Sequence, residues 1–506
     1  MRIARKWFAS GLAVFLPLQA VLLLWNPELL PVWTDEGHTL ETAPQAASEI
    51  IRRVATDVHP PLYFLLAHAW LRLPLPASGV ARLRLLSAVC ACATTLLIYR
   101  LWLARAGRAR QWWFLALWSA SPCLLLYGRM ARSYALQVMT ACLAFHAAHR
   151  CLRRPADVRL AVWFGVTLAL LLYTHYVPGL AALAAFAAVC IWQAARGRVV
   201  APLRDLAVAA GVSLILYAPW IAGLAGAVGK WTGRGETYRA FANPMLDEAA
   251  KIGYCLFSFS FGETPPPVAL VAAAALLPFV AWLALRGAWP QVASATGAFV
   301  LVGTSLAWVG VSRWVSFPFV PARLLFLLPL YLMLMAQGKE RSGKVGTALC
   351  AGIIAASLLS AGSYFRKADF LNKGYAAPFN EMAALVVSDA RDALVVVDAF
   401  NTDAHQITKQ LPSWLPSVIM RGPQSAEAVR RVVRKRDPRV VWYVRNTHDI
   451  SPGGLNRKLE QELSRGHATR LYLFQPYSAI ERRIIRMAGW PEVPTHFYQV
   501  MKVERR

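Results

Sequence analysis

Two adjacent carboxylates, Asp35 and Glu36, stand in the stretch WTDEGHTL at the end of a long apolar run. A carboxylate held near a nucleophile can accept its proton and act as a general base. The same two acids also suit the first turn of a helix that starts at Thr34, where the helix dipole stabilises negative charge. The choice between a catalytic and a capping role therefore depends on which other groups reach the same place.

Further reactive side chains stand in short polar segments between apolar runs. Arginine binds phosphate through its planar guanidinium, and histidine, tyrosine and aspartate can exchange protons. The candidates are Asp57, His59 and Tyr63 in DVHPPLY, Arg129, Arg132 and Tyr134 in GRMARSY, His175 and Tyr176 in THYVPGL, and Arg313 and Arg323 in SRWVSFPFVPARLL. Each has an ordinary alternative, because arginines at span ends often contact lipid headgroups and a histidine before two prolines also fits a rigid turn.

The composition indicates a polytopic membrane protein. Of the 506 residues, 57% are hydrophobic and 16% are charged, which is too apolar for a soluble enzyme of this size. A helix needs roughly 20 apolar residues to cross a bilayer. About eleven segments approach this length, namely 7–25, 81–103, 111–127, 131–149, 159–176, 177–194, 205–225, 266–285, 293–311, 320–336 and 345–363. The first is interpreted as a retained anchor, because no small-residue cleavage site follows it.

The distribution of lysine and arginine predicts the orientation. With the N-terminus in the cytoplasm, every inner loop carries at least one such residue, as the positive-inside rule requires. An odd number of spans then places the C-terminus outside, on the same side as WTDEGHTL and the other reactive segments. This bias accounts for much of the formal net charge of +27, which favours membrane lipids over nucleic acid as the partner.

Two connecting segments are long enough to have structure of their own. The first, 26–80, contains AASEIIRRVATD and PPLYFLLAHAWLRL, which are typical of helices lying in the plane of the membrane interface. A re-entrant or simply packed helix is the alternative. The second, roughly 226–265, is rich in glycine and aromatic residues and is consistent with either a lid or a plain connection.

The character of the chain changes after residue 363. Apolar β-branched runs such as DALVVVDAF and PRVVWYVRN alternate with helical stretches such as SAEAVRRVVRKR, a pattern that predicts a small α/β domain. The expected organisation is therefore a membrane domain over 1–363 and an outer α/β domain over 364–506. The eight cysteines all precede residue 364, so the outer domain is expected to hold together without disulfides.

Five of these segments together resemble the GT-C superfamily of membrane glycosyltransferases. They are WTDEGHTL, DVHPPLYFLLAHAW, GRMARSYAL, YTHYVPGL and VPARLLFLLPL, in this order and with this loop placement. The resemblance is strongest to the branch that contains protein O-mannosyltransferases and the aminoarabinose transferase of lipid A. It covers roughly residues 1–340 and says least about the C-terminal domain.

The resemblance implies roles for particular residues. An acid of the first outer loop is the catalytic base of that superfamily, which implies Asp35, with Glu36 beside it. Outer arginines bind the phosphate of a polyprenyl-phosphate sugar, which implies Arg129 or Arg132 and also Arg323. The acceptor stays open between a lipid, a glycan and a protein. Asp57, His59, Tyr63, Tyr134, His175 and Tyr176 are further site candidates.

The function expected from these observations is inverting sugar transfer at the periplasmic face of a bacterial inner membrane, with the C-terminal domain in the periplasm. No cofactor is required, and a divalent metal on Asp57, His59 and Glu36 is the less favoured alternative, because the ligands lack compact spacing. A flippase or transporter for a lipid-linked sugar is the rival. Transporters usually keep ionisable groups inside their spans, and the spans here are almost free of them.

Overall fold

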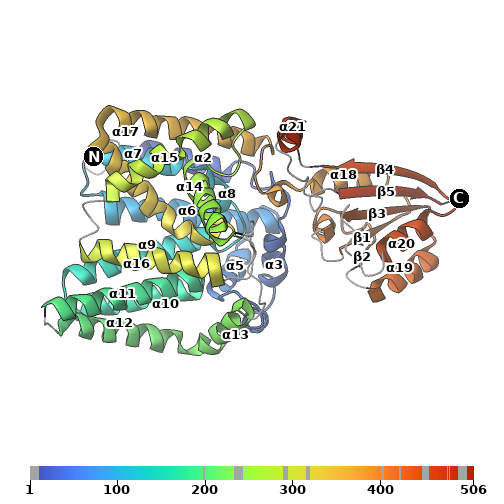
Figure 1. The fold of residues 1–506 in the computed structure, drawn as a ribbon. Helices are drawn as coiled ribbons and strands as arrows, with labels where there is room; N and C mark the ends of the chain where they lie inside the picture. The colour runs from blue at the N-terminus through green and yellow to red at the C-terminus, as the bar shows by residue number, and fades with distance from the viewer. Residues whose placement is uncertain are drawn as a thin grey trace. The chain divides into compact units, whose positions relative to one another are not determined.

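The computed structural model describes residues 11–197, 200–232, 243–288, 294–314, 319–399, 404–420, 423–446, 455–475, 477, 479–487 and 498–505 (Figure 1). The chain forms two compact units, Met1–Pro27 with Thr39–Tyr364 and Glu28–His38 with Phe365–Arg506. The helical unit has a core of its own, and the smaller unit has an apolar core on each face of a sheet. Arg2, Arg5, Lys6 and the start of the first expected span lie outside the described residues.

The helical unit begins with apolar helices that follow the expected spans. They are α2 (Leu12–Leu24), α6 (Gly79–Ile98) with the π-helical turn η1 (Tyr99–Leu103), α7 (Arg108–Ser119), α8 (Pro122–Gly128) and α9 (Tyr134–Arg153). The span expected over 111–127 is two helices. Ser121 caps α8 by accepting from the N–H of Leu124, and Pro122 follows at the first helical position. Since proline cannot donate the N–H that α7 would need to continue, the chain restarts there.

A second group of helices completes this unit. They are α10 (Val158–Thr174), α11 (Tyr176–Gly197), α12 (Ala201–Tyr217), η2 (Ala218–Trp220), α13 (Ile221–Thr232), α14 (Pro244–Phe261), α15 (Pro267–Ala288), α16 (Ala295–Val309), η4 (Gly310–Trp314), η5 (Pro321–Leu327) and α17 (Leu328–Phe365). Figure 1 shows α9, α16, α11, α10 and α12 running side by side. Gly343 breaks α17 with a φ of +54°, a conformation that glycine adopts without steric cost, and so separates the last two expected spans.

Small residues let some of these helices pack very closely. A Cβ on Gly287 would lie 2.0 Å from the carbonyl oxygen of Leu334, and one on Gly338 would lie equally near that of Leu283. The two glycines therefore allow the backbones of α15 and α17 to touch. Such small-residue contacts are typical of helix association in a bilayer, where apolar burial alone gives little preference for helix over lipid.

Several helices have the dimensions of membrane spans. Within the described ranges, six are long and apolar enough to cross a bilayer: Gly79–Leu103, Tyr176–Gly197, Ala201–Lys230, Ala269–Ala288, Ala295–Arg313 and Pro321–Phe365. Leu12–Leu24, Leu62–Leu71 and Val158–Thr174 are apolar but shorter. The predicted class, a polytopic helical membrane protein with an α/β part at its C-terminal end, is confirmed.

The connection 26–80 contains three helices, α3 (Thr34–Thr42), α4 (Ala47–Ala55) and α5 (Leu62–Leu71). The two expected helices correspond to α4 and α5. Of the three apolar residues expected on one face of α4, Ile50 and Val54 are buried, whereas Ile51 is exposed together with Arg52. The third helix, α3, starts at Thr34 and carries both carboxylates of WTDEGHTL in its first turn.

The second connection, 226–265, is more ordered than a plain loop. Helix α13 extends to Thr232, and α14 occupies Pro244–Phe261. The side chain of Asn243 accepts hydrogen bonds from the N–H groups of Met245 and Leu246, and Pro244 takes the first helical position. Residues 233–242, which hold most of the glycine-rich and aromatic stretch, lie outside the described part of the chain.

The smaller unit is built on a five-stranded sheet of order β2-β1-β3-β5-β4. Its strands are β1 (Ala393–Asp398), β2 (Ser417–Met420), β3 (Val440–Asn446), β4 (Ala468–Phe474) and β5 (Tyr498–Glu504). The strands β2, β1 and β3 are parallel, and β5 is antiparallel to both β3 and β4. The runs DALVVVDAF and PRVVWYVRN form β1 and β3 as expected, whereas the short edge strand β2 was missed.

Helices cover both faces of this sheet. Alternate side chains of β1 point to opposite faces, so Val395 and Val397 pack with α18 (Phe379–Ser388), whereas Leu394 and Val396 pack with α19 (Pro423–Arg436) and α20 (Leu455–Ser464). A fourth helix, α21 (Ala479–Met487), follows β4. Burial on both faces explains why the β1 and β3 sequences are continuous apolar runs rather than alternating ones.

Candidate functional site

The two carboxylates of WTDEGHTL have different surroundings. Oε2 of Glu36 accepts a hydrogen bond from the backbone N–H of Trp33 at 3.1 Å, and Glu36 is only 1% exposed. An acid at the third helical position that reaches back to the residue before the helix is one half of a capping box. Asp35 is half-buried and does not make this contact. The capping role thus belongs to Glu36, and Asp35 is the better candidate for a base.

The first turn of α3 is held in place by the smaller unit, to which it belongs. A Cβ on Gly37 would lie 2.7 Å from Oε1 of Gln406, so a larger residue there would displace the end of that glutamine side chain. The ring of Trp33 packs edge-on against Tyr375 with centroids 5.0 Å apart. These contacts fix the backbone on either side of Asp35. Farther along the same helix, Thr39 stands one turn after Asp35 and on the same face.

Arg132, His59 and Asp57 form a hydrogen-bonded chain in the helical unit. Nη2 of Arg132 lies 2.6 Å from Nε2 of His59, and Nδ1 of His59 lies 2.8 Å from Oδ2 of Asp57. A guanidinium can only donate, so Nε2 is the acceptor and the imidazole proton is on Nδ1, where it is donated to Asp57. Arg132 is 5% exposed, and its Nη1 also lies 3.5 Å from the hydroxyl of Thr39 in α3.

The same place gathers other predicted residues. His59, Tyr63, Arg132 and Thr174, among others, line a crevice that is too narrow to hold a water molecule. His175, in the turn between α10 and α11, lies close enough to His59, Arg323 and Arg132 to interact with them electrostatically. Burial, assisted by these three groups, lowers the pKa of His175 to about 3. His175 is therefore neutral at physiological pH and can serve only as a hydrogen-bonding group.

Arg129 has a different environment from Arg132, although the two are neighbours in one turn. Its Nη1 donates to the carbonyl of Leu22 at 2.8 Å, and its Nη2 donates to the carbonyl of Trp25 at 2.6 Å and to that of Asn26. Its guanidinium also lies over the ring of Tyr364. These contacts satisfy the carbonyl groups at the C-terminal end of α2. The arrangement favours a structural role for Arg129 and leaves Arg132 and Arg323 as the better phosphate candidates.

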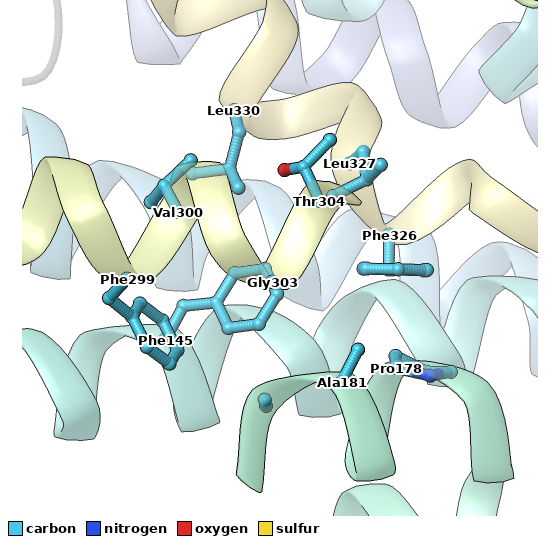
Figure 2. A pocket seen from close by; sticks show the side chains of 11 residues that line it. Phe145, Pro178, Ala181, Phe299, Val300, Gly303, Thr304, Phe326, Leu327 and Leu330 are labelled. Carbon is cyan, nitrogen blue, oxygen red and sulfur yellow. The ribbon is translucent and has the colours of Figure 1, made fainter. Parts of the chain in front are cut away.

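Arg323 stands in the 3-10 helix η5, beside an apolar cavity. Phe326 and Leu327, from the same short helix, line this cavity with side chains from α9, α11 and α16 (Figure 2). The cavity holds only about 10 Å³ and has almost no polar lining. Gly303 faces it, and a Cβ there would come no closer than 3.4 Å to a neighbour. This cavity is called the apolar seam below, and the short helix that contains Arg323 contributes two of its lining residues.

The two remaining predicted tyrosines are both buried. The hydroxyl of Tyr176 accepts a hydrogen bond from Nε1 of Trp220 at 2.9 Å, so it joins α11 to η2. Tyr134, at the start of α9, packs edge-on against Tyr127, whose hydroxyl donates to Glu263.

Arg313, a further arginine named from the sequence, contacts Glu248 at 3.7 Å and is mostly exposed.

Glu263 is a functional candidate that the sequence analysis missed. It lies between α14 and α15, is 1% exposed, and its Oε1 also accepts from the hydroxyl of Ser258 at 3.0 Å. Burial raises its pKa, against the opposing effect of these hydrogen bonds. The stretch FGETPPP places this single acid directly after an apolar, aromatic segment, and an acid in such surroundings needs hydrogen-bonding partners. The partners lie in distant segments, so the sequence alone could not identify them.

No sequence family and no curated protein matches the chain. Solved structures do. ArnT from Cupriavidus metallidurans in the apo state is 11% identical, with 99% of this chain and 98% of ArnT covered at a TM-score of 0.53. The oligosaccharyltransferase of Archaeoglobus fulgidus in the apo form is 12% identical, with 93% of this chain and 74% of the other covered at a TM-score of 0.54.

The chain has the GT-C fold. The resemblance drawn from the five motifs is therefore confirmed at the level of the fold, and with ArnT it extends over the whole chain, C-terminal domain included. Identities this low say nothing about individual residues. For Asp35, Arg132 and Arg323, the observations that bear on a role are therefore those of the local geometry given above.

Proposed function

We propose that the protein is an inverting glycosyltransferase that uses a polyprenyl-phosphate-linked sugar. The observation that carries the proposal is the buried Arg132, oriented by His59 and Asp57, with Arg323 close by, in a chain of GT-C fold. One solved ArnT structure is bound to undecaprenyl phosphate, and one archaeal oligosaccharyltransferase structure contains a dolichol-phosphate. The lipid-phosphate donor of this chain is proposed by analogy with them.

Arg132 and Arg323 are proposed to bind the phosphate of the donor. The leaving group of the reaction is a polyprenyl phosphate, which is a stable anion and needs positive charge rather than a proton donor. Fixed cations in a site with little water stabilise such charge without reorganising as the bond breaks. The contact of Arg132 with His59 keeps the guanidinium in one orientation before the donor arrives, which lowers the entropic cost of binding.

Asp35 is proposed as the general base. It takes the proton of the acceptor hydroxyl while the oxygen forms a bond to the anomeric carbon from the face opposite the phosphate. The bond between that carbon and the phosphate oxygen breaks, and its electron pair leaves with the polyprenyl phosphate. A base held in position contributes about 100-fold to 10,000-fold to the rate. Glu36 supports Asp35 by capping α3.

The apolar seam, to which Phe326 and Leu327 of η5 contribute, is proposed to receive the first isoprene units of the donor. Its volume of about 10 Å³ is that of roughly one water molecule, so the chain enters only if Phe145, Phe299 and Phe326 move aside (Figure 2). Aromatic side chains that meet edge-on, with the ring of Phe145 5.8 Å from that of Phe299 and 6.1 Å from that of Phe326, can rearrange without losing a hydrogen bond.

This scheme needs no metal ion, because the arginines supply the positive charge. The proposed location of the site is the outer face of a bacterial inner membrane, with the C-terminal domain in the periplasm. Nucleotide sugars are cytoplasmic, so a lipid-linked sugar is the donor available on that side. Fusion of alkaline phosphatase after Arg506 tests this orientation. The fusion is expected to be active, and an inactive but folded fusion would reverse the orientation.

The decisive experiment measures sugar transfer by the purified protein in detergent from a panel of synthetic polyprenyl-phosphate sugars. Asp35→Asn is expected to release polyprenyl phosphate at least about 100-fold more slowly than wild type, at an unchanged Tm. Glu36→Gln is the matched control, because glutamine can still accept from the N–H of Trp33. It is expected to keep activity within a few fold.

Other outcomes would overturn the proposal. Equal activity of wild type and Asp35→Asn would remove Asp35 from the mechanism and leave it as a residue of the first helical turn. If the wild type consumes none of the donors but moves a fluorescent polyprenyl-phosphate sugar between the leaflets of a liposome, the protein is a flippase.

A divalent-metal chelator tests the proposed independence from metal. The transfer rate is expected to be unchanged when the chelator is present.

A further inference from the structure

The smaller unit contains a cleft lined by both polar and apolar side chains. The cleft has a volume of about 290 Å³ and opens between the segment that follows α17, the start of α18, and the turn from β4 into α21. All of its lining belongs to the unit formed by residues 28–38 and 365–506. The side chains that give it its chemistry are Lys367, Asp369, Lys373, Glu381, Tyr477 and Glu481.

A buried ion pair lies at one side of this cleft. The side chain of Lys373 is 6% exposed, and its ammonium group contacts the carboxylate of Glu481. The same ammonium lies 5.1 Å from the ring centroid of Tyr477, in the geometry of a cation–π contact. These three groups fix one another, so the cleft presents a rigid aromatic ring next to ordered donors and acceptors.

The cleft carries a small excess of negative charge, because its lining holds two lysines and three carboxylates. Lys367 contacts Glu381 at 3.2 Å, as Lys373 contacts Glu481, and Asp369 adds a further carboxylate. Each cation already has an anion, so the cleft offers no excess positive charge to a phosphate or a carboxylate. The ligand that suits it must bring both donors and acceptors and no strong negative charge of its own.

The backbone of the cleft is held in an unusual conformation. Lys367 and Asp369 have φ values of 56° and 62°, in the left-handed region that side chains other than glycine rarely adopt. Two such residues separated by one position cost free energy, and residues of this kind concentrate where a binding surface has to be shaped. Here they turn the chain between α17 and α18 so that Lys367, Asp369 and Lys373 line the same space.

We propose that this cleft binds a neutral saccharide, as a subsite for the glycan part of the acceptor. Sugar hydroxyls are donors and acceptors at once, which matches alternating ammonium and carboxylate groups, and the C–H face of a sugar ring packs on an aromatic ring such as that of Tyr477. The volume suits one or two sugar rings, at the lower end of ordinary ligand pockets. The acceptor role rests on the proposed function; saccharide binding does not.

The test uses the full-length protein in detergent and saturation-transfer NMR with maltotriose, mannotriose and diacetylchitobiose as neutral probes. Glucose 6-phosphate is the anionic control. At least one neutral probe is expected to bind, and Tyr477→Ala and Lys367→Ala are each expected to weaken it by roughly tenfold, since each removes one side of the ligand's contacts. Lys409→Ala, which changes an exposed lysine outside the cleft, is expected to bind as wild type does.

The inference is overturned if no neutral probe binds, if both cleft variants bind as tightly as wild type, or if only glucose 6-phosphate binds. The two proposals fail separately. If wild type and Asp35→Asn both bind the saccharide but the wild type transfers no sugar, the saccharide site stands and the glycosyltransferase proposal is rejected. Normal transfer by a Tyr477→Ala variant that no longer binds saccharide would keep the glycosyltransferase and the saccharide site, and would reject the role of that site in holding the acceptor.

Discussion

Nη2 of Arg132 lies 2.6 Å from Nε2 of His59, and this contact determines the protonation of the imidazole. The guanidinium has no acceptor to offer, so the histidine accepts at Nε2 and donates from Nδ1 to Asp57. His59 therefore orients the arginine, while Asp57 orients the histidine. Carboxylates give the same kind of support to catalytic or ligating histidines elsewhere.

Replacing His59 should weaken donor binding. His59→Ala removes the acceptor that holds Arg132, so the KM for the polyprenyl-phosphate sugar is expected to rise by about tenfold or more, as for the loss of a hydrogen bond to a charged group. His59→Gln, which can still accept through its side-chain oxygen, is expected to recover most of the loss. Steady-state kinetics with varied donor concentration measures this KM. An unchanged KM in His59→Ala would show that the hydrogen bond from Arg132 to His59 does not orient the phosphate site.

The two arginines of GRMARSY should respond differently to the same substitution. Arg129→Ala leaves the carbonyl groups of Leu22 and Trp25 without their donor, so its main effect is expected on stability, at about 1 to 3 kcal/mol for each unsatisfied buried group. Arg132→Ala is expected to abolish transfer with a smaller change in Tm. Thermal unfolding and transfer assays on both variants test this contrast. Loss of activity in a fully stable Arg129→Ala would return Arg129 to the phosphate site.

His175 should make the protein less stable in acid. Burial and the neighbouring charges lower its pKa to about 3 in the folded protein, below the ordinary value of about 6.5. Between these two values the unfolded chain binds the proton and the folded one does not, so stability falls as pH decreases from about 6.5 toward 3. His175→Gln, which cannot be protonated, is expected to show a smaller fall in Tm between pH 7 and pH 4.5. An identical fall in both proteins would assign the acid sensitivity to other groups.

Glu263 should have the opposite pH dependence. Burial raises its pKa, so the folded state keeps a proton that the unfolded state releases, and its contribution to stability is lost as pH rises above the ordinary glutamate value. Glu263→Gln mimics the protonated form and can still accept from Tyr127. The variant is expected to gain Tm relative to wild type at pH 8 and to match it at pH 5. A lower Tm at both values would mean that the ionised carboxylate is required.

Local pattern determined much of the fold. Apolar runs must be buried in lipid or protein wherever they lie in the chain, so the positions of α2, α6 and α9 to α12 follow from hydropathy alone, as do β1 and β3 from their β-branched runs. The same local reasoning failed where the signal was short or polar. The four-residue strand β2 was too short to be predicted. Helix α14 was interpreted as part of a connection, because Asp247, Glu248 and Lys251 interrupt its apolar residues.

Only the tertiary structure separated residues that are neighbours in sequence. Asp35 and Glu36 are adjacent acids, and the contact of Glu36 with Trp33 distinguishes them. Arg129 and Arg132 share one turn, yet the first donates to carbonyls more than a hundred positions away and the second to a histidine 73 positions away. Helix formation depends on nearby residues, whereas the partner of a polar side chain depends on which distant segments pack beside it. The sequence therefore names the reactive groups, and the packing of the helices decides which of them act together.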